Sequence, residues 1–530
     1  MRRTFLFLGA LILAIAGGPG QAVAASGAVG SHPAVEHHRP RVLFVCNGST
    51  RPCPPVSRSV RPVFRKVQAA VNAARPGDWI LIWPGVYHEK SKRWPAAGVW
   101  IGKPGLHIRG MNRNKVIIDG SNGTAAHPCP SAAARQDFTP RDGIVVWKAS
   151  GVTIQNLTVC DYLAGPSGHG NEIWWNGGDG SGKIGLGAYS GSYLTATSMY
   201  GPTDIHSPHL AQYGIFVSNA SGPGTITRSY ASNMADAAYY VGACQRQCNT
   251  TLAHDTGVNS ALGYSGTNAG GRLLITESTF ALNRTGLAPN SLNNSDAPPP
   301  QDGRCPHSAT RSCTIIANNL IENNNNANAP TSGITPAVGA GIELAGGSFD
   351  TVTGNLIKNQ GSWGVVAHDY PDPEKPPPGS HCQGGIRNDP APGFCLFPAR
   401  GNKIFRNSFR HVGFFGNQTN SDLATETLAA RTPRNCFYRN IALTGVLSSA
   451  PAHIERANVD GPPCGRPGTG NDVALFEQLI CATGFTTCPL PSKDARYPKQ
   501  TRIAILPLPP LPTMPNFCTA MPRSVFCPDK

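Results

Sequence analysis

Short apolar segments recur along this chain at a nearly constant spacing, and this repetition limits the possible folds more than any other feature. Where the chain is uninterrupted, successive segments start about 23 to 25 residues apart, and longer intervals contain Gly-, Pro- or Cys-rich insertions. Periods in this range are typical of solenoids, in which each repeat buries its apolar residues only against neighbouring repeats. The segments begin at Gly143, Gly214, Ala238, Ala261, Thr285, Gly341, Trp363 and Gly413.

A second apolar run follows most of these segments and ends in a small polar residue. Asn, Ser and Asp suit tight turns because they tolerate left-handed backbone angles and hydrogen-bond the nearby backbone. We therefore expect a polar ladder along the stacked turns, formed by Asn156, Ser229, Asp255, Ser278, Asn318, Asn355 and Asn407. Short strands and polar turns at this period predict an all-β parallel β-helix. Leucine-rich repeats need a Leu spacing that is absent, and propeller units are longer.

The clearest amphipathic helix signal stands ahead of the repeats. Phe64, Val67, Val71 and Ala74 lie on one helical face, and Gly77 ends the helix before the first strand. The end of a β-helix is an apolar cross-section with unpaired strand edges. We therefore expect this helix to cap the solenoid.

The stretch FRKVQAAVNAARPGDWILIWPGVYHE, residues 64–89, resembles the amino-terminal cap of the right-handed parallel β-helix, or pectin-lyase-like, superfamily. The later repeats resemble the coils of that superfamily over about residues 60–445. Its families include pectate and pectin lyases, polygalacturonases and mannuronan epimerases, and also binding and surface proteins. The resemblance thus implies the fold and leaves the function open.

Composition shifts divide the chain into four parts. Residues 1–25 contain two arginines, an apolar run and a small-residue cleavage site, which are features of a secretory signal peptide. Residues 26–59 form an N-terminal extension, residues 60–445 the β-helix, and residues 446–530 a Pro- and Cys-rich extension that packs along or caps it. No other apolar run is long enough to span a membrane, so we expect a secreted, extracellular protein.

All 16 cysteines follow the predicted cleavage point. In an exported chain, close spacing favours local disulfides that pin long loops, although the connectivity cannot be derived from spacing alone. No Cys-x-x-Cys motif is present, so we expect no metal site on the cysteines. The close neighbours are Cys46 and Cys53, Cys244 and Cys248, Cys305 and Cys313, Cys382 and Cys395, Cys481 and Cys488, and Cys518 and Cys527.

One exposed sheet is the predicted substrate surface. If the recurring segments stack, their second and fourth residues point inward and their third and fifth outward. One outward row then reads Val145, Phe216, Tyr240, Gly263, Ala288, Glu343, Val366 and Phe415. The other reads Trp147, Ser218, Gly242, Ser265, Asn290, Ala345, His368 and Asn417.

Aromatic and polar side chains on such a surface suit sugar rings and hydroxyls. The predicted contacts are Trp147, Phe216, Tyr240 and Asn290, with Trp174 and Trp175 on an insertion at about residues 165–200 that overhangs the groove. The alternative is an ordinary solvated face, with the two tryptophans only fastening the insertion.

The string AHDYPDPE supplies the predicted catalytic residues. His368 and Asp369 follow a strand and Glu343 lies one coil earlier, so a base and a charge partner can stand together. The string resembles one in mannuronan epimerases, although the Asp-Pro that precedes His-Asp there is missing. Polysaccharide lyases of this fold often use an Arg or Lys base, for which Arg284 and Arg272 are candidates. The alternative is a polar turn that leads into a Pro-rich loop.

Two other strings containing histidine are weaker candidates. Asp255 in LAHDTG falls at the ladder position, so we interpret it as a turn residue. SGHGNE, residues 167–172, is similar to the Gly-His-Gly of polygalacturonases, but their other motifs are absent in order, which disfavours hydrolysis. The cofactor is unknown; calcium is compatible with Asp369, Asp372 and Glu374, and no metal ligand is assigned.

The formal net charge of +15 favours an anionic partner at low salt. The basic residues are scattered and DNA-binding motifs are absent, so we expect no nucleic-acid partner. The sequence therefore predicts a secreted monomer that acts on acidic polysaccharide, as a lyase or epimerase of uronate-containing polymers. The alternative is a non-catalytic carbohydrate-binding or cell-surface β-helix protein.

Overall fold

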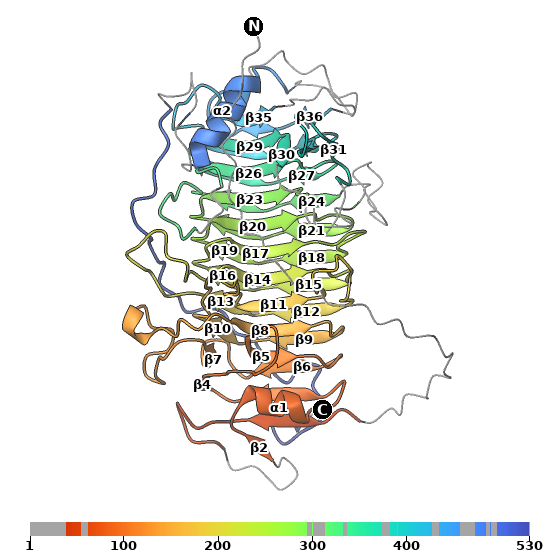
Figure 1. Cartoon of the computed structure of the whole chain (residues 1–530), viewed down its shortest axis with the longest axis vertical. Coiled ribbons are helices and arrows are strands. Elements are labelled where there is room, and N and C mark those ends of the chain that lie inside the picture. Colours follow the sequence, from red (N-terminus) through yellow and green to blue (C-terminus); the bar gives the residue numbers. More distant parts are fainter. Residues whose placement is uncertain are drawn as a thin grey trace, which may run out of the picture.

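The computed structural model describes residues 39–54, 62–293, 299, 313–331, 336–372, 382–389, 391–426, 434–455, 472–483, 488 and 495–528. Three long parallel sheets run the length of the molecule, and each coil contributes one strand to each (Figure 1). The predicted all-β, right-handed parallel β-helix is thus confirmed. The predicted signal peptide lies outside the described residues.

We name the three sheets A, B and C. Sheet A has 13 strands in the order β2 (Val63–Phe64), β1 (Val42–Val45), β3 (Trp79–Ile82), β6 (His107–Gly110), β9 (Val152–Gln155), β12 (Tyr189–Ser192), β15 (Gly224–Thr227), β18 (Thr250–Ala253), β21 (Leu273–Thr276), β24 (Thr314–Ala317), β27 (Thr351–Thr353), β33 (Lys403–Phe405) and β36 (Cys436–Tyr438). Sheet B has 11 strands, β4 (Gly85–Tyr87), β7 (Val116–Asp119), β10 (Thr158–Cys160), β13 (Thr195–Thr197), β16 (Tyr230–Ser232), β19 (Thr256–Val258), β22 (Thr279–Ala281), β25 (Leu320–Glu322), β28 (Leu356–Gln360), β34 (Ser408–Val412) and β37 (Ile441–Ala442).

Sheet C also has 11 strands, β5 (Ala97–Ile101), β8 (Asp142–Trp147), β11 (Ile173–Asn176), β14 (Tyr213–Ser218), β17 (Ala237–Gly242), β20 (Leu262–Thr267), β23 (Thr285–Asn290), β26 (Ala340–Ala345), β29 (Trp363–His368), β35 (Ser421–Thr425) and β38 (Ser449–Ala450). A small antiparallel sheet joins β30 (Tyr370–Asp372), β32 (Cys395–Phe397) and β31 (Ile386–Arg387). The described helices are α1 (Val67–Ala73), α2 (Asp472–Thr483) and a 3-10 turn at Ala133–Arg135. None of these helices is long and apolar enough to cross a membrane.

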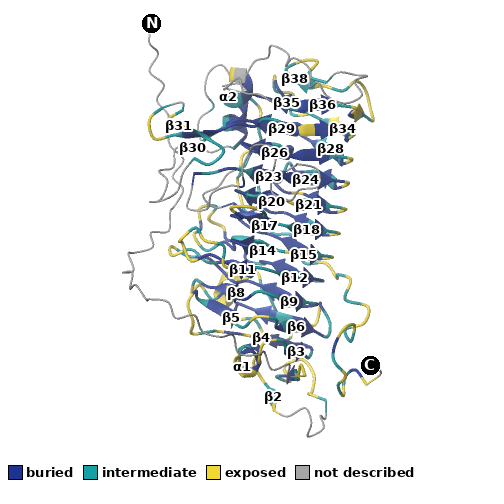
Figure 2. Cartoon of the chain, turned by 90° about the vertical axis from the view of Figure 1, so that its right-hand side faces the viewer, coloured by how far each residue is buried: buried dark blue, intermediate teal, exposed yellow. Residues whose placement is uncertain are grey.

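The core lies inside the coils, where the strands of all three sheets are buried, and exposed residues gather in the loops (Figure 2). The helix α1 covers the first coils, as predicted, with Val67 and Val71 buried. The carboxylate of Glu89 accepts hydrogen bonds from the backbone N–H groups of Val67 (2.7 Å) and Gln68 (3.2 Å). It therefore satisfies donors that every helix start leaves unpaired. Phe64 lies ahead of the helix, in β2.

Glycine recurs near the start of the sheet C strands because the coils approach closely there. A Cβ at Gly263, Gly286 or Gly341 would lie 2.4–2.5 Å from the carbonyl oxygen of the next coil. Only glycine fits that space, which explains the repeated Gly of the apolar segments.

The polar ladder exists, with two corrections. Its members each donate a backbone N–H to the side chain of the next: Ser229, Asp255, Ser278, Asn319, Asn355, Asn407 and Asn440. Asn319 rather than Asn318 is the ladder residue, because Asn318 takes the left-handed turn position, with φ of 58°, and is exposed. Asn156 has the same backbone angle and instead accepts hydrogen bonds from Thr513 and Met514.

Five of the predicted neighbouring cysteine pairs form disulfides: Cys46–Cys53, Cys244–Cys248, Cys382–Cys395, Cys481–Cys488 and Cys518–Cys527. A sixth bond, Cys129–Cys160, joins residues 31 positions apart and is not among the predicted pairs. Cys305 lies outside the described residues.

Residues 495–528 run back along the outside of the coils from the α2 end to the α1 end (Figure 1). Asn259 and Arg113 donate hydrogen bonds to the carbonyl oxygens of Ala504 and Pro512 in this segment. At its end, the ring of Phe526 stacks on Phe44 with centroids 4.4 Å apart. The segment therefore fastens coils that are far apart in the stack.

Candidate functional site

Aromatic side chains line the outer face of sheet C across three successive strands. The register pairs Trp174 with Phe216 and Phe216 with Tyr240. The rings of Trp174 and Phe216 are stacked with centroids 5.1 Å apart, and Tyr213 stacks on Phe216 at 4.4 Å. We call Trp174, Phe216, Tyr213 and Tyr240 the aromatic stripe. All but Tyr240 are partly exposed.

The prediction for the neighbouring tryptophans needs correction. Trp174 belongs to strand β11 of sheet C and does not overhang it, and its indole N–H donates to Ser218 Oγ at 3.0 Å. Trp175 points inward and is fully buried, with its ring 6.0 Å from that of Tyr189. Because strand residues alternate between faces, one tryptophan of the pair lies outside and the other inside. Trp175 therefore cannot contact a ligand on the outer face.

Trp147 and Asn290 lie in the second outward row. Trp147 is half-buried and makes an edge contact at 5.1 Å with Trp94, which is 71% exposed. The sequence pattern missed Trp94, because it lies in a loop outside the repeats. Asn290 is partly exposed and pairs in register with Thr267 and Ala345.

The predicted rows slip at two places. Ser265, not Gly263, pairs with Tyr240, so the row shifts by two residues on β20 and keeps the same face. The segment at Gly413, with Phe415 and Asn417, forms a turn, and β35 takes the corresponding place in sheet C.

His368 and Glu343 meet on the outer face of sheet C, as the sequence predicted. Glu343 lies on β26 and His368 ends β29, and His368 Nε2 is 3.1 Å from Glu343 Oε1. His368 Nδ1 is 3.0 Å from the backbone oxygen of Asp369, which can only accept, so Nδ1 donates. A single proton then lies between His368 Nε2 and Glu343 Oε1, on either the imidazole or the carboxylate.

The charge distribution decides where that proton lies. Burial alone lowers the pKa of His368, but the hydrogen bond to Glu343 and the negative charges of Glu343 and Glu426 outweigh it and raise the pKa. The pair therefore favours the imidazolium form of His368. Glu343 Oε2 is buried and forms no hydrogen bond among the described residues.

Asp369 does not join the dyad through its carboxylate. Its Oδ1 accepts the Ala399 N–H at 2.8 Å, and its own backbone N–H donates to Glu426 Oε2 at 3.1 Å. The Asp372 carboxylate accepts the Asn293 N–H. Both aspartates thus fasten the layer around β30 and β32, and among the described residues they do not gather with a third acid as metal ligands. Glu374 lies outside the described residues.

Arg284 is in a different place from the dyad. It is buried immediately before β23, and its guanidinium donates to the carbonyl oxygens of Ala327 (2.9 Å) and Thr483 (2.9 Å). His368 ends its strand, and Arg284 is level with the residue before that strand, so six residue steps, or roughly 20 Å along the strand direction, separate the two. The predicted convergence of Arg284 with His368 is therefore wrong. Arg272 precedes β21, in sheet A.

Glu426 is the residue near the dyad that the sequence pattern misses. It directly follows β35, and its backbone N–H donates to the Ala367 carbonyl oxygen at 2.9 Å. The repeat pattern assigns the segment at Gly413 to this coil, so no signal points to Glu426.

Comparison with known proteins finds likenesses to this chain among solved structures. No family model matches it, and no curated protein does. Among solved structures, it is similar to the A-module of the mannuronan C-5 epimerase AlgE4 of Azotobacter vinelandii, at 12% identity and a TM-score of 0.42 over 76% of this chain and 95% of that one. It is also similar to pectate lyase Pel9A, at 11% identity and a TM-score of 0.37 over 79% and 78% of the two chains.

A tailspike protein double mutant of E. coli bacteriophage HK620 is similar at 12% identity and a TM-score of 0.41, over 77% of this chain and 67% of that one. These likenesses concern the fold alone. With three parallel sheets coiled around one core, this chain has the right-handed parallel β-helix fold that its sequence predicts.

Proposed function

We propose that this protein is secreted and acts on an acidic polysaccharide that lies along the outer face of sheet C. The observation that carries the proposal is that the aromatic stripe and the Glu343–His368 dyad share this one face. Three strand steps separate Tyr240 on β17 from Glu343 on β26, or roughly 14 Å at the usual strand spacing. A polysaccharide can therefore stack one sugar on the aromatic stripe while another sugar of the same chain contacts the Glu343–His368 dyad.

The dyad supplies the two proton positions that uronate chemistry requires. In a lyase or an epimerase, the first step removes the proton from the carbon beside the uronate carboxylate, and Glu343 is the base for this step. The imidazolium of His368 is the acid. In elimination its proton goes to the leaving oxygen as the C–O bond breaks and the C=C bond forms; in epimerisation a proton returns to the opposite face of the same carbon.

Burial of the dyad favours a second function. The side chains of His368 and Glu343 are only 8% and 13% exposed, which suits a pair that holds neighbouring coils together. In that case the aromatic stripe alone binds polysaccharide, and the protein is a non-catalytic binding or surface protein. The disulfides support an extracellular location for both functions.

The experiment measures proton removal directly. The purified chain is incubated in deuterated water with pectate, alginate and glycosaminoglycans, with and without calcium. Deuterium at the uronate carbon is followed by NMR, and unsaturated uronate by ultraviolet absorbance. Catalysis predicts deuterium incorporation or unsaturation, and Glu343→Gln lowers the rate by at least about 100-fold.

His254→Gln is the matched control. His254 and Glu277 form another histidine–glutamate pair between adjacent coils, 2.9 Å apart, and both are about half exposed. This variant should keep full activity. If no polymer exchanges or is cleaved, but the chain binds one and Trp174→Ala with Phe216→Ala weakens that binding, the non-catalytic function holds. Gel filtration tests the expected monomer.

A further inference from the structure

A second histidine–carboxylate pair lies where the sheet C strands begin, and its histidine belongs to the string SGHGNE. Asp142 starts β8 and His169 lies in the loop before β11, with His169 Nδ1 at 3.0 Å from Asp142 Oδ2. Asp142 is fully buried, and its Oδ1 accepts the backbone N–H of Asn171 at 3.0 Å and the side-chain N–H of Asn171 at 2.9 Å. The carboxylate is thus held in place, and it fixes the orientation of the imidazole ring.

The other ring nitrogen of His169 is open to a ligand. Nδ1 donates to Asp142, so Nε2 lies on the far side of the ring, and it forms no hydrogen bond within the described part of the chain. The side chain of His169 is 18% exposed, whereas that of Asp142 has no exposed surface. Both ring nitrogens of His368, by contrast, have partners. His169 is therefore the better placed of the two histidines to donate Nε2–H to a bound molecule.

The loop that carries His169 lies beside the aromatic stripe. The Gly170 carbonyl oxygen accepts the Gln212 N–H at 2.7 Å, and the Glu172 N–H donates to the Tyr213 carbonyl oxygen at 2.8 Å. The register of β11 with β14 puts Asn171 level with Tyr213, one strand spacing or roughly 5 Å away. A sugar ring on the stripe is therefore close enough for one of its substituents to reach the imidazole.

The charged groups around this histidine decide which substituent it attracts. Lys90 and Arg141 both pair with Asp137, at 2.7 and 2.8 Å, and Arg141 adjoins Asp142 in the chain. Together with Asp142 and a protonated His169, this group contains three cations and two anions. With a neutral imidazole the charges balance. Protonation of His169 thus gives the start of these strands an excess positive charge that suits an anion.

Other titratable groups near the loop have partners of their own. His209 Nδ1 is 3.1 Å from a backbone carbonyl oxygen, and Asp236 Oδ2 accepts the Tyr213 hydroxyl at 2.6 Å. Burial raises the pKa of Asp236 to about 7 and that of Glu172 well above its usual value. A variant of His169 itself is therefore needed to separate its titration from theirs.

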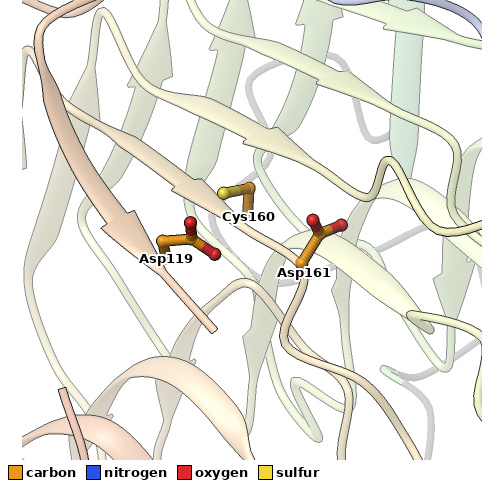
Figure 3. A group of neighbouring side chains, drawn as sticks. All are labelled: Asp119, Cys160 and Asp161. Atoms are coloured by element: carbon orange, nitrogen blue, oxygen red, sulfur yellow. The ribbon is translucent and has the colours of Figure 1, made fainter. Parts of the chain in front are cut away.

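A neighbouring acidic cluster is closed to a ligand. Asp119 ends β7 and Asp161 follows β10, and one carboxylate oxygen of each lies within 4.8 Å of the other and of the Cys160 sulfur (Figure 3). The two Asp119 oxygens accept hydrogen bonds from the backbone N–H groups of Ser121 and Cys129, and the Cys160 sulfur is bonded to Cys129. All three members are buried, so the cluster belongs to the packing of the turn and does not face a polymer on sheet C.

We propose that protonated His169, held by Asp142, donates Nε2–H to the carboxylate of a uronate residue that lies on the aromatic stripe. Aromatic rings stack on neutral and acidic sugars alike, whereas a charge-assisted hydrogen bond selects the carboxylate. The inference rests on the proposed polysaccharide function and names the residue that makes the face selective for acidic sugars. It does not depend on catalysis by the Glu343–His368 dyad.

The selectivity depends on pH with a defined sign. The hydrogen bond to Asp142 raises the pKa of His169, so the imidazolium persists above the usual value of about 6.5. Binding of a uronate is therefore strongest below about pH 6.5 and weakens as pH rises through the higher value. The uronate carboxylate stays ionised throughout this range, so the change comes from the protein.

The test measures binding of short oligogalacturonate and oligomannuronate by the full chain, followed by tryptophan fluorescence at about pH 5.5 and about pH 8. The same oligomers with their carboxylates reduced to alcohols are the neutral probes. We expect the affinity of the wild type for an acidic oligomer to fall by at least about fivefold between the two pH values. Its affinity for the neutral probes should stay constant.

Two variants make the test specific. His169→Gln should bind the acidic oligomer weakly and equally at both pH values, while it keeps the wild-type affinity for the neutral probe, which a merely structural role would not predict. His254→Gln removes a half-exposed histidine that pairs with Glu277 on sheet A and should behave as the wild type. It controls for the loss of one titrating charge.

The outcomes separate this inference from the proposed function. If no oligomer binds the wild type, both fail. If Trp174→Ala with Phe216→Ala weakens binding but His169→Gln keeps the wild-type pH dependence, only this inference is overturned, and equal pH dependence for the neutral probe overturns it as well. If His169→Gln does not fold, NMR titration of the wild type decides, because the acidic oligomer must raise the pKa of His169 and the neutral probe must not.

Discussion

Replacing one ladder residue tests what holds the coils in register. Asn319 and Asn318 are neighbours, but only Asn319 is buried in the ladder. The Asn319 side chain accepts the Ser278 N–H at 3.0 Å and donates to the Ile275 carbonyl oxygen at 3.0 Å and to Asn355 Oδ1 at 3.0 Å. Asn319→Leu keeps a similar shape and removes all three bonds.

The expected loss follows from the groups left behind. Asn355 Oδ1 still receives the backbone N–H of residue 319, and the Ile275 carbonyl lies within strand β21, which is paired on both sides, so one buried group loses its described partner, the Ser278 N–H. A buried group left without a partner costs about 1–3 kcal/mol, so we expect the free energy of unfolding to fall by about that amount. Domains are typically stable by about 5–15 kcal/mol, so the variant should unfold at a clearly lower urea concentration.

Asn318→Gly is the matched control. Asn318 has φ of 58°, which glycine adopts without strain, so its free energy of unfolding should change by less than about 0.5 kcal/mol. Equilibrium urea unfolding by circular dichroism compares the two, and hydrogen exchange reports whether β21 and β24 open locally. An Asn319→Leu loss below about 1 kcal/mol, or equal losses for both variants, would refute the reasoning that the ladder holds the register.

Two further predictions concern residues that the sequence predicts to be catalytic, Arg284 and the His368–Glu343 pair. Arg284→Ala removes the guanidinium hydrogen bonds to the Ala327 and Thr483 carbonyl oxygens. The free energy of unfolding, measured by urea unfolding, should fall by about 3–5 kcal/mol. The fraction of the variant that folds should keep any deuterium-exchange activity of the wild type. Because the pKa of His368 is raised in the folded chain, its stabilising contribution is complete below the unfolded pKa of about 6.5 and is lost as pH rises through the higher folded value. The difference in urea midpoint between wild type and Glu343→Gln should therefore shrink as pH rises above about 6.5, and a constant difference would contradict the ion pair.

The fold could be predicted because its signals are local and repeated. The capping helix, the glycine near the start of most sheet C strands and the small polar residue at the turns all depend on positions within one coil. The register could be predicted only to within small shifts, and in the coil of β35 the sequence pattern assigns the strand itself to the wrong segment. The assignment of Gly263 in place of Ser265 displaces a strand by two residues, which preserves the face because strand side chains alternate.

Adjacent similar residues account for two further errors. Asn318 and Asn319 both suit a polar turn, and only the stacking of neighbouring coils decides which one enters the ladder. Trp174 and Trp175 both suit a sugar-binding loop, but once they form a strand one of them must face the core. Neither choice is visible in composition or spacing, because both members of each pair have the same chemistry.

The position of a residue within its coil, more than its distance in sequence, decides which side chains can meet in a solenoid. Glu343 and His368 are one coil apart and lie in adjacent outward positions of neighbouring strands, so their side chains touch. Arg284 precedes its strand, whereas His368 ends its own. These positions lie at opposite ends of the strands, so they stay apart in every coil. Position within the coil is therefore sufficient to exclude Arg284 from the dyad. The same rule places Glu426 beside the dyad, one position beyond the end of β35, as soon as that strand is correctly assigned.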